Sequence, residues 1–201
     1  MKKNIIWIIL LILIVNPAML LFADEHPQYV QEAQKLYDQN RYIESLKILE
    51  SNNVTDGYKY YLIFLNEQEI GIKAMKGIIK PGHDNYKYIK YAQEHPDRYY
   101  YWEPSSHYYL RPDHINELTE QVLKNSPDNK TFISKMLYKL AESYVMLSSE
   151  DEEDMDEQEW DKIINAYKKA FEYAKGKEKE EIKKQIDKFE GLKKYYISSG
   201  K

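Results

Sequence analysis

The sequence predicts an all-α chain in which antiparallel helical hairpins stack as a short α-solenoid. The main evidence lies between residues 135 and 175, where two apolar series recur at the spacing of an α-helix. The first series is Leu137, Leu140, Ala141 and Tyr144, and the second is Trp160, Ile163, Ile164, Tyr167, Ala170, Phe171 and Ala174. Two such helices cannot bury their apolar faces against each other alone, so the hairpin requires further helices beside it.

Residues 1–23 have the pattern of a secretory signal peptide. Lys2 and Lys3 form a basic head, residues 5–15 are uninterrupted and apolar, and Ala23 offers the small side chain that signal peptidase needs. The alternative is an uncleaved anchor, because residues 5–23 are just long enough to span a bilayer, although Pro17 lies within them. We therefore expect an exported chain, periplasmic or secreted, with residues 24–201 as its helical domain.

Composition excludes several kinds of site. The 201 residues contain no Cys, which removes disulfides, thiolate nucleophiles and cysteine zinc sites. Nine acids and no base lie in residues 150–161, and twelve lysines against six acids lie in residues 162–201. Neither run combines with a nucleic-acid-binding motif, so we expect solvated surfaces and no nucleic-acid partner.

Helices are also predicted before the main hairpin. Apolar faces recur over residues 28–36 and 42–49, with Asn40 as the turn between them. The stretch Thr55-Asp56-Gly57 is a candidate cap for a helix that begins near residue 58 and continues to Ile79, although Gly71 and Gly77 would each weaken it by about 1 kcal/mol. A shorter helix is predicted over residues 84–94.

The middle of the chain is less regular. Residues 97–112 show no helical period, and their aromatic residues and Pro104 suit an extended loop or a short strand. Pro112 can begin a helix, and Ser126 is a candidate cap for the helix that follows. Residues 148–159 are predicted to be a solvated acidic loop, and residues 177–197 a capping helix with one apolar stripe.

These apolar patterns resemble the tetratricopeptide repeat family, whose unit is a helical pair with small residues where the helices cross. Leu137, Leu140, Ala141, Tyr144, Trp160, Tyr167 and Ala170 match one unit, except that Ile163 stands where the family prefers Ala. A second match is Tyr29, Ala33, Leu36, Tyr42, Ser45 and Leu49, and a weaker third is Tyr58, Tyr61, Leu62, Leu65, Ala74 and Ile78. The resemblance implies an interaction scaffold with a concave binding face and no chemistry of its own.

An aromatic-rich segment supplies the candidate binding residues. Eight Tyr, one Trp and three His lie between His83 and Tyr109, and aromatic rings offer large, rigid and amphipathic contact surfaces. The candidates are Tyr99, Tyr101, Trp102, Tyr108 and Tyr109, which would anchor a peptide or stack on sugar rings. The alternative is that these rings fill the core where helical packing is irregular.

No pattern for metal, cofactor or catalysis is complete. The histidines at 83, 95, 107 and 114 form no i, i+4 pair, and the faint calcium-loop pattern at residues 154–158 lacks the required Gly. Glu103 beside Trp102 is an acid in a sequence setting rich in apolar rings, but a glycosidase needs two placed carboxyl groups. We therefore expect a non-enzymatic scaffold that binds a protein or peptide in a cell-envelope assembly, with a glycan-binding module and then a cell-wall hydrolase as alternatives.

Overall fold

The computed structural model describes residues 26–148 and 155–198, and these residues are mostly helical, as predicted. The helices are α3 (Gln28–Asp38), α4 (Tyr42–Glu50), α5 (Gly57–Lys73), α6 (Tyr86–Glu94), α7 (Pro112–Asn125), α8 (Lys130–Leu147), α9 (Glu157–Tyr173) and α10 (Gly176–Ser198). The predicted signal peptide lies outside the described residues. Within the described ranges, every helix is too short or too polar to cross a bilayer.

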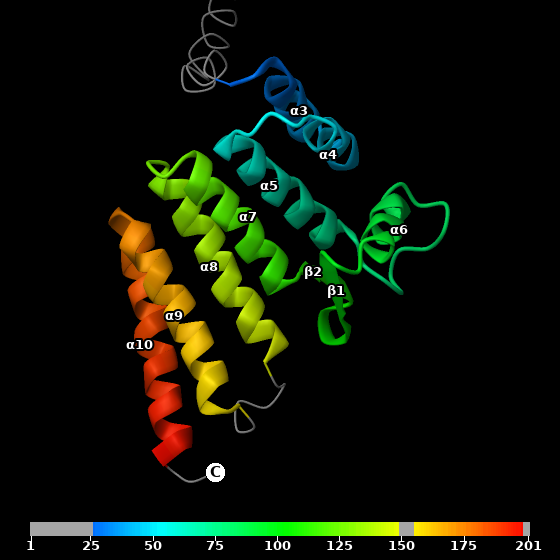
Figure 1. Ribbon diagram of the computed structural model, residues 1–201. Coiled ribbons are helices and arrows are strands. Elements are labelled where there is room, and N and C mark those ends of the chain that lie inside the picture. Colours follow the sequence, from blue (N-terminus) through cyan, green and yellow to red (C-terminus); the bar gives the residue numbers. More distant parts are fainter. Residues whose placement is uncertain (1–25, 149–154, 199–201) are drawn as a thin grey trace, which may run out of the picture.

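Seven of these helices pack in chain order, and one insertion interrupts the series (Figure 1). In this series each helix packs against the next, in the order α3, α4, α5, α7, α8, α9 and α10. In addition, α5 contacts both α3 and α8. The insertion lies between α5 and α7. It contains α6 and an antiparallel hairpin of β1 (Tyr99–Trp102) and β2 (His107–Leu110), joined by a 3-10 turn at Glu103–Ser105.

The predicted apolar faces are buried where the helices meet. Ala141 and Tyr167, from the main hairpin, are 0% and 3% exposed and lie in the core with Trp160. At the crossing of α3 and α4, the Ser45 hydroxyl donates to the backbone oxygen of Ala33 at 2.8 Å, and both residues are fully buried. Small side chains therefore do allow close helix contact at that crossing, as the sequence predicts.

Two acidic side chains start helices. Asp56 accepts a hydrogen bond from the Tyr58 backbone N–H at 2.7 Å, which confirms a cap of α5 within the predicted stretch 55–57 and identifies Asp56 as the capping residue. Asp156 and Glu159 form a reciprocal capping box at the start of α9. The predicted loop over residues 148–159 is therefore too long, because residues 157–159 already belong to this helix; residues 149–154 lie outside the described part of the chain.

Two predicted helix boundaries are wrong. The helix predicted to reach Ile79 ends at Lys73, because the chain turns there to meet the hairpin. The Lys76 backbone N–H donates to the Ser106 oxygen at 2.9 Å, and Gly77 adopts a positive φ of 83°. Ser126 closes α7 through its backbone N–H bond to Val122 and does not cap α8, which begins at Lys130.

Helix α5 is buried on most of its circumference, because α3, α4, α6, α7, α8 and β2 all contact it. Strand β2 comes so close that a Cβ atom placed on Gly71 would lie 2.5 Å from the backbone oxygen of Tyr108. Gly71 therefore has a packing role that offsets its poor helix propensity.

Replacing Gly71 by Ala should destabilise the protein by about 1–3 kcal/mol, because the strand must move away from the helix. The matched control is Gly191→Ala in α10, where the added Cβ would have no neighbour within 4 Å. That control should stabilise the protein by up to about 1 kcal/mol through helix propensity. Urea unfolding followed by circular dichroism measures both, and equal effects would contradict the close contact.

Candidate functional site

A groove lies along α5, α8 and α10. It consists of two adjoining pockets, of about 140 and 210 Å³, that share Phe64, Gln68 and Lys139. The first pocket lies between α5, β2, α7 and α8, and the second between α5, α8 and α10. The three shared residues come from α5 and α8, so the two pockets adjoin along these helices.

The groove combines an apolar floor with a polar rim. Phe64, Leu110, Ile115 and Ile182 are buried side chains of its floor, while Ile72 at one end is 51% exposed. The rim carries charges of both signs: Lys135, Lys139, Glu142, Glu178 and Glu181. An apolar floor with a few polar groups is typical of a binding site.

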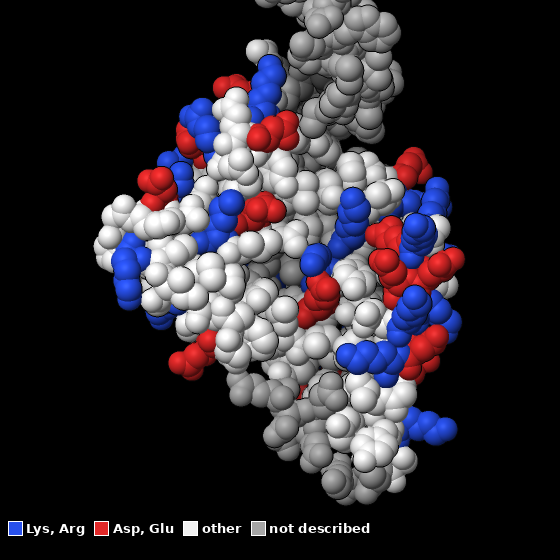
Figure 2. Space-filling model, turned by 180° about the vertical axis from the view of Figure 1, so that it is seen from behind, with Lys and Arg blue, Asp and Glu red and all other residues white. Residues whose placement is uncertain are grey.

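Several of the charged side chains on the rim already have partners in the structure. Lys139 pairs with Glu142 at 2.6 Å, and Glu178 accepts a bond from the Ser134 hydroxyl at 3.2 Å. Figure 2 shows one face of the molecule, where charged side chains crowd the α9–α10 side and are sparser over the middle.

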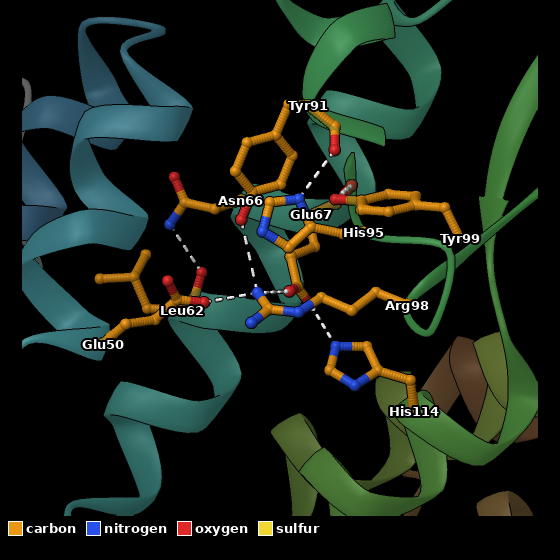
Figure 3. A network of polar contacts seen from close by, with 9 residues as sticks. All are labelled: Glu50, Leu62, Asn66, Glu67, Tyr91, His95, Arg98, Tyr99 and His114. Carbon is orange, nitrogen blue, oxygen red and sulfur yellow. Dashed lines mark hydrogen bonds and ion pairs between the residues drawn. The ribbon is translucent and has the colours of Figure 1, made fainter. Parts of the chain in front are cut away.

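A buried charged cluster lies beneath the first pocket (Figure 3). Its centre is Glu67 of α5, which has no exposed surface and lines that pocket. Its two carboxylate oxygens contact Arg98 at 2.9 Å and the Nε2 atom of His114 at 2.7 Å. Arg98 also pairs with Glu50 of α4, and the Tyr99 hydroxyl donates to the backbone oxygen of Glu67 at 3.1 Å.

The electrostatics of this cluster follow from burial and pairing. Burial alone would lower the pKa of Arg98, but its hydrogen bond to Glu50 and the charge of Glu67 raise that pKa overall. Burial raises the pKa of Tyr91 and raises that of Tyr99 well above its ordinary value. Arg98 is therefore charged, and the phenols of Tyr91 and Tyr99 are neutral. In these states the cluster can join α4, α5, α7 and the start of β1 through ion pairs and hydrogen bonds.

The hairpin sorts the predicted aromatic residues onto two faces. Tyr99 and Tyr108 are 2% and 6% exposed and pack into the core, and Tyr108 also lines the first pocket. Tyr101 is half-buried and lies beneath the Lys76 ammonium, which is 4.6 Å from its ring centre. Trp102 and Tyr109 are half-buried on the opposite face.

That opposite face contains two further rings that the sequence analysis did not select, Tyr100 and His107. The ring of Tyr109 lies 6.0 Å from Tyr100, 5.9 Å from Trp102 and 6.3 Å from His107. Burial raises the pKa of Tyr100 to about 12. Since Tyr109 also lines the first pocket, this aromatic face adjoins the groove.

The other predicted chemical groups are not brought together. Glu103 is exposed, so the apolar setting that its sequence neighbours suggest is absent; the deeply buried acid is Glu67. Within residues 26–148 and 155–198, His, Asp and Glu side chains form no cluster of three or more that could hold a metal ion.

Sequence reasoning missed Glu67 and the groove for identifiable reasons. A second face of α5 repeats at helical spacing and consists of Ile63, Phe64, Glu67, Ile70 and Gly71. The position of Glu67 on this otherwise apolar face was the one sequence feature that could have indicated a buried acid. Its partners Arg98 and His114 lie 31 and 47 residues further along the chain. No local pattern connects such distant positions.

No protein-family model, curated protein or solved structure matches the chain, so its function must be inferred from the site itself.

Replacing Glu67 by Ala should lower the free energy of unfolding by about 3–5 kcal/mol, because Arg98 and His114 would lose their buried carboxylate. Glu67→Gln should cost less, since the amide oxygen can still accept one hydrogen bond. The control is Glu94→Ala, which removes an exposed ion pair with Lys90 at 3.8 Å and should change little. Denaturant titration measures all three, and a Glu67→Ala effect as small as the control would show that the cluster does not hold the helices together.

Proposed function

We propose that this chain is an exported, tetratricopeptide-like scaffold that binds an extended segment of a protein partner. The proposal rests on the groove along α5, α8 and α10, which has an apolar floor and a rim that carries both lysines and glutamates. The helices that form the groove share one buried apolar core, and a preformed site lowers the entropic cost of binding a flexible segment.

The order of helix contacts supports the scaffold assignment. The pairs α3–α4, α5–α7 and α8–α9 are consecutive packed helices, and α10 follows as an end cap. Helices α3, α5 and α8 are then the first members of their pairs, and they contact each other as the inner layer of a superhelix would. On this interpretation, α6 and the β-hairpin are an insertion within the second pair, and β2 closes one end of the groove.

The residues at the helix crossings support the same assignment. Ala33 and Ser45 are fully buried where α3 meets α4, and Ala141 and Ala170 are fully buried in α8 and α9. Small buried side chains of this kind permit the close approach that repeated helical pairs need.

Replacing Ile72 by Ser should weaken peptide binding about tenfold or more, because Ile72 would lose its apolar contact at the groove end. The matched control is Ile78→Ser, since Ile78 is 60% exposed but lines neither pocket. A displayed library of random peptides supplies the ligands, and fluorescence anisotropy of the enriched peptides measures their affinities. Failure of the library to converge, or equal binding by both variants, would reject the groove.

A glycan-binding module is the second candidate, favoured by one observation. Tyr100, Trp102, His107 and Tyr109 share one half-exposed face of the hairpin, with ring centres about 6 Å apart. Rings on a rigid hairpin can stack on the apolar faces of sugars.

Replacing Trp102 by Ala should abolish binding to purified cell-wall glycan while the helical circular dichroism spectrum stays unchanged. Tyr195→Ala is the control, because Tyr195 is 62% exposed on α10, far from the hairpin in the chain. Sedimentation with insoluble glycan gives the bound fraction. Equal binding by the two variants would exclude the aromatic face as a sugar platform.

A further inference from the structure

A second surface, independent of the groove, lies on the loop that joins α5 to α6, residues 74–85. Figure 1 shows this loop projecting at the edge of the molecule opposite α10. Ile78 is 60% exposed there, while its neighbour Ile79 packs against the core. The loop thus presents one large apolar side chain to water.

The loop holds Ile78 outward through a defined backbone structure. Its base is fastened to the hairpin by the Lys76 N–H bond to Ser106 and by the bridge between Met75 and His107. At its tip, the Ile79 N–H donates to the Met75 oxygen at 3.1 Å across Gly77, whose positive φ few other residues adopt. The exposure of Ile78 is therefore a property of a fixed turn.

Lysines are frequent in the sequence on both sides of this apolar tip. Residues 73–90 contain five lysines and one acid, Asp84, and Glu69 and Glu94 flank this stretch in the sequence. Of the lysines, Lys76, Lys80, Lys87 and Lys90 are exposed; the acids near them are Asp84, Glu94, which pairs with Lys90, and Glu103 at the hairpin turn.

We propose that the α5–α6 loop docks on the surface of a bilayer containing anionic lipid, with Ile78 inserted among the headgroups and the lysines on lipid phosphates and carboxylates. Charge complementarity favours an anionic surface, since residues 73–90 carry five lysines and a single acid. The exposed Ile selects a bilayer over a soluble polyanion, because only the bilayer offers an apolar layer in which to bury it. One inserted isoleucine and a few lysines give weak, reversible attachment. At low salt, each lysine near the surface should raise the affinity for the membrane roughly fivefold.

Site-specific fluorescence tests this docking in the full chain. Because the sequence contains no Cys, Ile78→Cys can carry a single environment-sensitive label, and Val54→Cys, at a residue 55% exposed, carries the same label as a control. Vesicles of phosphatidylcholine with phosphatidylserine should shift the emission at position 78 to the blue, and vesicles of phosphatidylcholine alone should not. No shift at position 78, or an equal shift at position 54, would overturn the proposal, and the second result would indicate attachment through another part of the chain.

Unlabelled variants separate insertion from simple charge attraction. In vesicle sedimentation at low salt, Ile78→Ser should weaken binding about tenfold, and Lys76→Gln with Lys80→Gln about twenty-fivefold. Ile72→Ser, in the groove, should leave vesicle binding unchanged. Membrane docking would be overturned if the lysine substitutions weakened vesicle binding, Ile78→Ser did not, and the protein bound dextran sulfate as well as it binds vesicles. That combination would identify a site for soluble polyanions. Because Ile72 and Ile78 serve as each other's controls, failure here leaves the test of the groove intact.

Discussion

The carboxylate of Glu67 lies at the centre of the molecule with no exposed surface, where it would be too costly without Arg98 and His114. Each partner comes from a different element: Arg98 precedes β1, and His114 lies in the first turn of α7. Through Arg98 the cluster also reaches Glu50 of α4. One buried charge therefore fixes how the inserted hairpin and two neighbouring helices sit on α5, and α5 forms one wall of the groove.

The insertion between α5 and α7 gives the molecule two separate surfaces. On one side, β2 lies against α5 at Gly71 and forms part of the first pocket. On the other side, the α5–α6 loop is fastened to the hairpin turn and carries Ile78 outward. If both proposals hold, the loop would place the scaffold at a membrane surface while the groove remains free for a partner.

The groove and the loop also differ in their electrostatics. The rim of the groove combines lysines with glutamates, and one such pair is already formed between Lys139 and Glu142. A partner there would be selected mainly by shape and apolar contact, with charge setting its direction. The loop carries an excess of lysine in an acidic chain, so its binding should depend strongly on salt.

The sequence by itself determined the helical class, most helix positions and the residues that become core, because a 3.6-residue apolar period is a local signal. It also placed Asn40 in a turn and a helix cap within residues 55–57, since such preferences depend on only a few neighbouring residues. Only the tertiary structure decided that α5 ends at Lys73, that Tyr99 and Tyr108 face inward, and that Glu67 meets Arg98 and His114. These outcomes depend on contacts between residues tens of positions apart, and no period or propensity along the chain records which distant side chains will meet.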